Sequence, residues 1–259
     1  MDFQDQDTVG DNRYLVKPLY KAAQVLRTVC QSPTALTLKD ITELCEIPKT
    51  TVYRYLYTMQ KLDMIAHDPR LETYSPGFGL WWLMQTADPF ANLRLVGRRQ
   101  RRKLMKRFNA TVSLGVLTGS QILYLEIIEC CRSLRMQAQP GARDEVHSTA
   151  LGKALLAFRP RSQWDALIPE KMVRRTANTI VVRRDLLENL EQVRRNGYAI
   201  ERGENEDGAS CIAAPIIDEN GFSVASISVS LPTNQTSDAL FSEIVAAVVD
   251  TCQIIQSRL

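Results

Sequence analysis

The fold is decided by the stretch Ile47-Pro48-Lys49-Thr50-Thr51-Val52-Tyr53-Arg54-Tyr55-Leu56-Tyr57-Thr58-Met59. Pro48 suits the first turn of a helix, where a backbone N–H has no intrahelical partner. Val52, Leu56 and Met59 recur at helical spacing and form one apolar stripe. The other face carries cationic, hydroxyl and aromatic side chains suited to phosphates and base edges: Lys49, Thr50, Thr51, Tyr53, Arg54 and Tyr57. The stretch predicts either a DNA-recognition helix or an ordinary amphipathic surface helix.

The segment before this stretch favours the recognition helix. Apolar residues recur with helical period from Val16 to about Cys30. A second helix is expected to begin at Thr37, because Asp40 stands three residues later, as in a capping box. Two short helices joined by a turn of three or four residues have the helix-turn-helix pattern. We place this motif at about residues 37–60.

The segment after it resembles a wing. Two short strand-like runs, 64–67 and 72–75, flank the turn-forming Asp68-Pro69 pair. Arg70 is expected at the tip of this hairpin, where it can reach a phosphate or the minor groove. We therefore predict a winged helix-turn-helix domain over residues 14–76, preceded by a disordered acidic tail over 1–13.

The same residues resemble a known family. Leu36-Thr37-Leu38-Lys39-Asp40-Ile41, followed by the stretch from Ile47 to Leu56, resembles the DNA-binding domain of IclR-type bacterial transcription regulators. The sequence departs from the family pattern at Tyr53, where His is frequent, and at Tyr55 and Tyr57, where Leu and a polar residue are usual. We take all three as exposed recognition positions. The departures therefore bear on which operator sequence is bound, and not on the mode of DNA binding.

Composition limits the possible functions. The chain has 259 residues, 45% hydrophobic and 24% charged, as in a soluble globular protein with room for one large domain or two modest ones. A net charge of +3 does not by itself imply nucleic-acid binding. Six irregularly spaced cysteines without a CxxC, and two histidines, predict neither a metal site nor a disulfide framework. With no signal peptide and no membrane-spanning run, we expect a cytoplasmic protein that needs no cofactor.

A linker helix, or two, is expected over about residues 78–108, with Asp88-Pro89 as an interruption. Its apolar patch (Leu80, Trp81, Leu83 and Met84) would help to form a dimer, as the family resemblance implies. Eight cations lie between Arg94 and Arg107 with no acid among them. We interpret them as a solvated helix face, with phosphate contact as the alternative.

The rest of the chain predicts an α+β domain, the second part of a unit that extends over 77–259. Strands are expected at 112–116, 122–128, 134–138, 198–201, 210–217 and 222–230, and helices at 147–158, 163–168, 184–196 and 238–259. The segments from His147 to Ala157 and from Asn196 to Pro215 also resemble the IclR family. The resemblance implies a GAF-like effector-binding fold, with helices flanking an antiparallel sheet.

The last two strands predict a cavity. If residues 218–221 close a hairpin, Cys211 lies opposite Ser228, and Ser226, Ser228 and Ser230 share one face. Three hydroxyls suit a cavity for an oxygen-rich ligand, whereas the alternative is a solvent-facing sheet surface. The helix start at residues 148–151 offers backbone amides to an anion. The resemblance then implies an effector site for a small organic acid, a 2-oxo or aromatic carboxylate, formed by Ala150, Leu151, Glu201, Cys211, Ser228 and Ser230.

Two other functions remain open at this point. His147 with Cys211 could form a thiol nucleophile and base, but no third orienting residue is identifiable. Adjacent Cys130 and Cys131 could sense oxidants. We expect instead a regulator that is not an enzyme, binding a palindromic operator in double-stranded DNA as a homodimer or tetramer. The resemblance implies repression. The expected DNA-binding residues are Lys49, Thr50, Thr51, Tyr53, Arg54 and Arg70.

Overall fold

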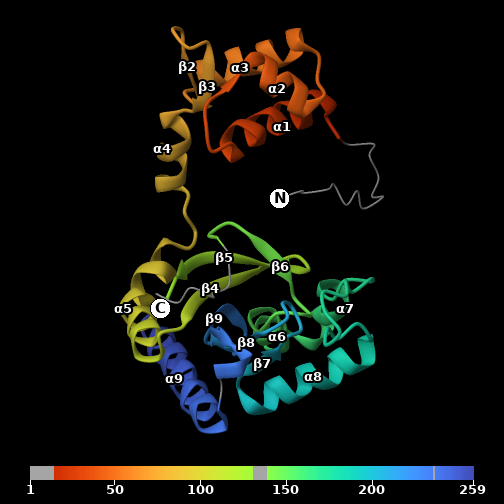
Figure 1. Ribbon diagram of the computed structural model, residues 1–259, viewed down its shortest axis with the longest axis vertical. Coiled ribbons are helices and arrows are strands. Elements are labelled where there is room, and N and C mark those ends of the chain that lie inside the picture. The colour runs from red at the N-terminus through yellow and green to blue at the C-terminus, as the bar shows by residue number, and fades with distance from the viewer. Residues whose placement is uncertain (1–14, 131–138, 236) are drawn as a thin grey trace. The chain divides into compact units, whose positions relative to one another are not determined.

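A computed structural model describes residues 15–130, 139–235 and 237–259 (Figure 1). Within it the chain divides into two compact units, Met1–Asp88 and Pro89–Leu259, and each is described by itself. The tail expected over 1–13 and the strand expected at 134–138 lie outside the described residues.

The first unit is a winged helix-turn-helix domain. Three helices enclose a small apolar core that contains Val29, Ile41 and Leu56. The helices are α1 (Lys17–Gln31), α2 (Leu38–Cys45) and α3 (Lys49–Lys61), and a three-stranded antiparallel sheet contains β1 (Leu36–Thr37), β2 (Ile65–Asp68) and β3 (Thr73–Pro76) in the order β1-β3-β2. The fold predicted for this part of the chain is confirmed.

Local signals fix the two helices of the motif. The backbone N–H of Asp40 donates to Thr37 Oγ1 at 3.2 Å, and the N–H of Thr37 donates to Asp40 Oδ2 at 2.9 Å. This is the predicted capping box. Pro48 stands one residue earlier than expected, because its ψ of 135° is not helical. It is the N-cap of α3, and its carbonyl accepts the N–H of Val52 at 3.1 Å.

The linker is formed by two helices, α4 (Phe78–Thr86) in the first unit and α5 (Ala91–Phe108) in the second. The break between them includes the expected interruption at Asp88-Pro89. The apolar side chains of α4 are exposed: Phe78, Trp81, Trp82, Leu83 and Met84 each have at least half of their surface in solvent.

Arg101 does not belong to the solvated face that the cation run predicts. Its side chain is fully buried, and Nε donates to Glu126 Oε2 at 2.8 Å. Its Nη2 donates to the carbonyl of Arg94 at 2.6 Å. Gly97 lies next to this side chain, since a Cβ there would be 2.3 Å from Arg101 Nη1. Glu126, the carboxylate that pairs with Arg101, lies on a strand 25 residues further along the chain. The charges near Arg101 in the sequence therefore could not reveal this ion pair.

The second unit is built on one antiparallel sheet in the order β6-β5-β4-β9-β8-β7. Its strands are β4 (Thr111–Thr118), β5 (Gln121–Ile128), β6 (Arg143–Glu145), β7 (Ala199–Arg202), β8 (Ala209–Ile217) and β9 (Ser223–Pro232). The predicted α+β class is confirmed, while β6 is a strand that the sequence did not predict at this position.

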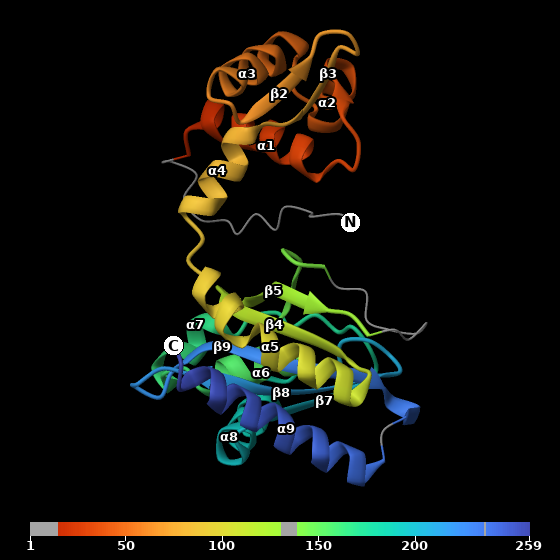
Figure 2. The ribbon, with the colours of Figure 1, turned by 90° about the vertical axis from the view of Figure 1, so that its left-hand side faces the viewer.

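Helices cover both faces of this sheet (Figure 2). On one face lie α5 and α9 (Asp238–Gln256), and on the other α6 (Ala150–Ala157), α7 (Trp164–Leu167) and α8 (Arg183–Asn196). Two short 3-10 turns, Arg161–Gln163 and Thr233–Gln235, precede α7 and α9. The serine-bearing face of β9 is therefore covered by α6, so the alternative of a solvent-facing sheet surface is wrong.

The register of β8 and β9 differs from the expected one by two residues. Cys211 pairs with Ser230, not Ser228, and Ala213 pairs with Ser228. The cause is an irregularity between Ile216 and Ile217, together with a turn in which the N–H of Asp218 donates to the carbonyl of Phe222 at 2.8 Å. A bulge adds residues to one strand and moves the pairing.

The close approach of α6 to the preceding segment requires a glycine. A Cβ at Gly152 would lie 2.4 Å from both the Cα and the carbonyl oxygen of Val146. These are backbone atoms, which cannot move aside as the end of a side chain can. Gly152 therefore sets how deeply the first turn of α6 packs.

We expect Gly152→Ala to destabilise the protein by about 3 kcal/mol, because overpacking here displaces backbone. Gly115→Ala is the matched control, since its Cβ would meet the end of the Leu151 side chain at 3.3 Å and the carbonyl oxygen of Leu123 at 3.4 Å, an ordinary contact distance. Urea unfolding of both variants measures the difference. Equal losses would show that the position of α6 does not depend on this contact.

Candidate functional site

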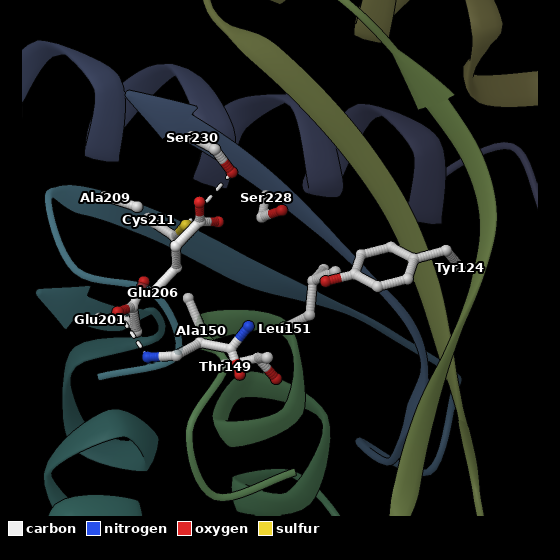
Figure 3. A pocket seen from close by; sticks show the side chains of 11 residues that line it. Tyr124, Thr149, Ala150, Leu151, Glu201, Glu206, Ala209, Cys211, Ser228 and Ser230 are labelled. Atoms are coloured by element: carbon white, nitrogen blue, oxygen red, sulfur yellow. Dashed lines mark hydrogen bonds between the residues drawn. The ribbon is translucent and has the colours of Figure 1, made fainter. Parts of the chain in front are cut away.

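One pocket brings together all six residues expected at the effector site (Figure 3). It contains about 310 Å³ of empty space, part of it open to solvent. Residues reach it from β5, the start of α6, β7 and the loop after it, β8 and β9. The six residues are Ala150, Leu151, Glu201, Cys211, Ser228 and Ser230. Their proximity is a structural result, whereas their binding of an effector remains a prediction. Ser226 does not line the pocket, since its hydroxyl donates to the carbonyl of Ala214 at 2.9 Å.

Several polar groups of the pocket have no partner among the described residues. Thr149 caps α6 by accepting the N–H of Gly152 at 3.1 Å, while the amides of Ala150 and Leu151 remain without a hydrogen bond. The hydroxyl of Ser228, a 4% exposed side chain, is also without a partner in this part of the chain. These groups can donate to a ligand, and the amides stand at the positive end of a helix dipole.

Glu201 supplies the buried charge of the pocket. Its side chain is 1% exposed, and Oε1 accepts the N–H groups of Glu204 at 2.5 Å and Asn205 at 3.1 Å. Burial raises the pKa of the Glu201 carboxyl, while the backbone donors at Asn205 and Glu204 oppose this rise. The opposite residue on β8 is Cys211, whose thiol donates to Ser230 Oγ at 3.2 Å.

The pocket also contains residues that the sequence did not reveal: Tyr124, Thr149, Asn205, Glu206 and Ala209. Alternation along β5 could have placed Tyr124, because Ile122 and Tyr124 face the same side. Asn205 and Glu206 lie in the loop between β7 and β8. A loop has no repeating pattern of apolar residues, so the sequence could not predict where their side chains point.

This loop is attached to α6 at two points. Lys153 Nζ lies 2.7 Å from Glu204 Oε1, with the lysine fully buried and the glutamate side chain 13% exposed. The hydroxyl of Ser148 donates to Asn205 Oδ1 at 2.7 Å. The start of α6 and the loop that carries Glu206 therefore form a single wall of the pocket.

A chain of polar contacts runs from Tyr124 in the pocket through Asp144 to Arg175 at the surface. The hydroxyl of Tyr124 donates to Asp144 Oδ2 at 3.2 Å, and Arg175 Nη2 lies 3.1 Å from Asp144 Oδ1. Burial, with the Asp144 charge, raises the pKa of Tyr124 well above its usual value, so the phenol keeps its proton.

The arrangement does not activate Cys211 as a nucleophile. Burial, followed by the Glu201 carboxylate, raises the pKa of its thiol well above the usual value. A nucleophilic cysteine needs the opposite shift. His147 is fully buried, and its Nε2 lies 3.0 Å from the carbonyl oxygen of Val173. For the redox alternative, Cys130 is a buried free thiol, while Cys131 lies outside the described residues.

The candidate DNA interface is the exposed face of α3 and the wing. Lys49, Thr50, Tyr53 and Arg54 are exposed and Thr51 is half-buried. Arg70 is exposed in the turn of the β2–β3 hairpin, where its N–H donates to Asp68 Oδ1 at 2.8 Å. Tyr55 is half-buried and not exposed as expected, because it packs against the core of the first unit.

The described ranges contain neither a cluster of metal ligands nor a membrane-spanning helix. No three His, Cys, Asp or Glu side chains of residues 15–130, 139–235 and 237–259 gather as metal ligands would. In the same part of the chain, no helix has the length and apolar composition to cross a membrane.

Known proteins share both units. Residues 90–257 match the family model described as "Bacterial transcriptional regulator IclR C-terminal", and residues 18–69 match "IclR helix-turn-helix domain". The Escherichia coli (strain K12) HTH-type transcriptional regulator KdgR is 34% identical over 223 residues, which cover 85% of each protein. The HTH-type transcriptional repressor AllR of the same organism is 28% identical over 93% of this chain and 89% of its own.

A solved structure extends the likeness to the fold. An IclR homologue from Microbacterium hydrocarbonoxydans, complexed with 4-hydroxybenzoate, aligns with a TM-score of 0.81 over 93% of this chain and 98% of its own, at 24% identity. A winged helix-turn-helix joined to a pocket-bearing α+β unit defines a DNA-binding transcriptional regulator with an effector-binding domain. The chain belongs to the IclR family of these regulators.

Burial of the Glu201 carboxyl raises its pKa, so the ionised form should lower the stability of the fold. An acid whose folded-state pKa is raised destabilises the fold once it ionises, a cost that grows as the pH rises through that pKa. Glu201→Gln removes the charge and keeps an oxygen for the two backbone donors. We therefore expect the variant to be more stable than the wild type at pH 7.

The difference between the two proteins should shrink as the pH falls from 7 towards about 4.3, the usual pKa of a glutamate. Urea unfolding across this range measures it, with Glu188→Gln on the exposed side of α8 as the control. A variant less stable than the wild type at pH 7 would mean that the ionised carboxylate stabilises the fold.

Proposed function

We propose that this protein represses transcription from an operator bound by α3 and the wing, and that a small carboxylate in the pocket controls this binding. The DNA-binding class follows from family membership. The effector, the six pocket residues that bind it and the sign of regulation are our proposal. The name of the relative AllR, a transcriptional repressor, supports repression and not activation as the sign of regulation.

One observation carries the effector proposal. The unpaired amides of Ala150 and Leu151 and the unpaired hydroxyl of Ser228 line the same cavity. Buried donors are rarely left without partners, so a bound molecule with acceptor oxygens suits this arrangement. A carboxylate fits the start of α6, because the first helical amides and the helix dipole both favour negative charge.

The other end of the ligand needs different chemistry. Glu201 and Glu206 line the pocket, and no Lys or Arg is among its lining residues. Carboxylates accept hydrogen bonds, so they favour ligand groups that donate them. We infer an organic acid that also carries hydroxyl groups. The 4-hydroxybenzoate bound by the M. hydrocarbonoxydans homologue has such a hydroxyl, although the likeness of that protein bears on the fold alone.

A second copy of the chain completes the proposal. A palindromic operator requires two recognition helices, hence a dimer or a dimer of dimers. The exposed aromatic side chains of α4, among them Trp81 and Trp82, form an apolar surface that such a partner would cover.

The effector must bind the DNA-competent and DNA-free arrangements with different affinity, since equal affinity shifts no population.

A panel of ligands tests the effector class. Hydroxy acids, 2-oxo acids and aromatic carboxylates, each beside its neutral amide, are titrated by thermal shift and calorimetry. We expect a hydroxylated acid to bind at least tenfold more tightly than its amide, and Ser228→Ala to reduce this affinity. Preferential binding of the neutral amides would contradict the role of the α6 amides.

A single substitution tests the DNA interface. The guanidinium of Arg54 has no ion pair with the described residues and is free to contact DNA. Arg54→Ala should weaken binding to a selected operator about tenfold, because one contact of this kind is worth roughly 1–3 kcal/mol. Effector affinity should not change, since the pocket lies in the other unit. Lys39→Ala, on the exposed side of α2, is the control; unchanged operator binding by Arg54→Ala would contradict the placement of α3.

A further inference from the structure

The exposed face of α3 carries a line of side chains that continues beyond its first turn. Tyr53, Tyr57 and Lys61 follow at intervals of four residues, so they are neighbours along one side of the helix. Tyr53 and Tyr57 each have 50% of their surface exposed, and Lys61 is exposed as well. Within α3, these two rings are the large apolar groups on the face that Arg54 shares.

Two neighbours orient the ring of Tyr57. Its centroid lies 6.4 Å from that of Tyr53, with 30° between the ring planes. The ammonium of Lys61 lies 5.2 Å from the same Tyr57 centroid, within the range of a cation–π contact. Stacked aromatic pairs at this distance attract each other. A ring that is already oriented loses less conformational entropy when DNA binds.

The chemistry of the major groove indicates what such a ring can read. Thymine alone presents an apolar group there, its C5 methyl, whereas the other base edges present hydrogen-bond donors and acceptors. Lys49, Thr50 and Arg54 supply polar groups for those donors and acceptors and for phosphates. The apolar surface of Tyr57 matches the methyl group, which the polar side chains of the same face do not.

We propose that Tyr57, positioned by Tyr53 and Lys61, is a specificity-determining residue that selects thymine through its C5 methyl group. The inference rests on the proposed placement of α3 in the major groove. Four residues of helix rise about 6 Å, and successive base pairs about 3.4 Å, so Tyr53 and Tyr57 stand about two base steps apart. Tyr53 thus presents a second ring to a base pair about two steps away.

A different role for the same side chains would be phosphate binding. A tyrosine hydroxyl can donate to a phosphate oxygen, which positions the protein without reading sequence. The two roles depend on different atoms of Tyr57. Thymine selection requires the ring, and phosphate binding requires the hydroxyl. Tyr57→Phe keeps the ring and removes the hydroxyl, so it separates them.

The experiment uses the full-length protein and begins with selection of preferred sites from a random-sequence DNA library. Each thymine of the selected site is then replaced by uracil, which removes only the methyl group. Binding to every duplex is measured for the wild type, Tyr57→Ala and Tyr57→Phe. Tyr20→Ala, which removes a tyrosine that is 42% exposed on α1, is the matched control.

We expect one uracil to weaken wild-type binding about fourfold, the equivalent of about 0.8 kcal/mol for one buried methyl group. Tyr57→Phe and Tyr20→Ala should show the same fourfold loss. Tyr57→Ala should bind the thymine and uracil duplexes equally.

Three results would overturn the inference while leaving the proposed function intact. These are a selected site with no methyl-sensitive thymine, a Tyr57→Ala variant that remains as methyl-sensitive as the wild type, and a Tyr57→Phe variant that loses the sensitivity. A wild-type protein that selects no sequence from the library would contradict the proposed function itself.

Discussion

The buried ion pair between Lys153 and Glu204 holds the pocket together. Its 2.7 Å contact joins α6 to the loop between β7 and β8, and both charges are largely removed from water. Separating them would leave a buried charge unpaired, which is far more costly than losing a surface pair. The loop in turn places the N–H groups of residues 204 and 205 against Glu201. The start of α6 and the acidic side of the pocket are therefore joined by these contacts.

The central sheet connects the pocket residues to α5 through side-chain packing. Ser228 faces the pocket, while its neighbours on β9, Ile227 and Val229, lie in the core that includes α5 and α9. Because successive residues of a strand point to opposite faces, a shift of β9 acts on both layers at once. Arg101 of α5 is itself fixed to β5 by Glu126. Closely packed layers transmit such displacements because they have little free volume to absorb them. The helix α5, which follows the DNA-binding unit in the chain, is thus packed on the sheet whose other face lines the pocket.

Sequence reasoning succeeded where the cause is local and failed where it is distant. The capping box at Thr37 and Asp40 depends on residues three apart, and the helix ending at Gly197 on a single left-handed residue with φ of 81°. The burial of Arg101 depends on an acid 25 residues away, which no window of sequence displays. The β8–β9 register is instructive because the expected pairing was wrong by two residues, yet Cys211, Ser228 and Ser230 still share the pocket face. An even shift preserves the alternation of faces, whereas a shift of one would have moved them to the other core. Asn205 and Glu206 had no pattern that could place them.

The two faces of α3 have different environments, one buried in the core and one exposed. Val52, Leu56 and Met59 are buried and fix α3 against the core, and Tyr55 joins them because it packs on the same side. The departure of Tyr55 from the family pattern therefore concerns packing against the core and not contact with DNA. Tyr53 and Tyr57 lie on the exposed face, where a substitution costs little folding free energy because few contacts are lost. Residues on that face can therefore change while the buried residues keep the domain folded. This division explains how a chain can match the IclR helix-turn-helix over residues 18–69 and still carry its own aromatic residues on the exposed face of α3.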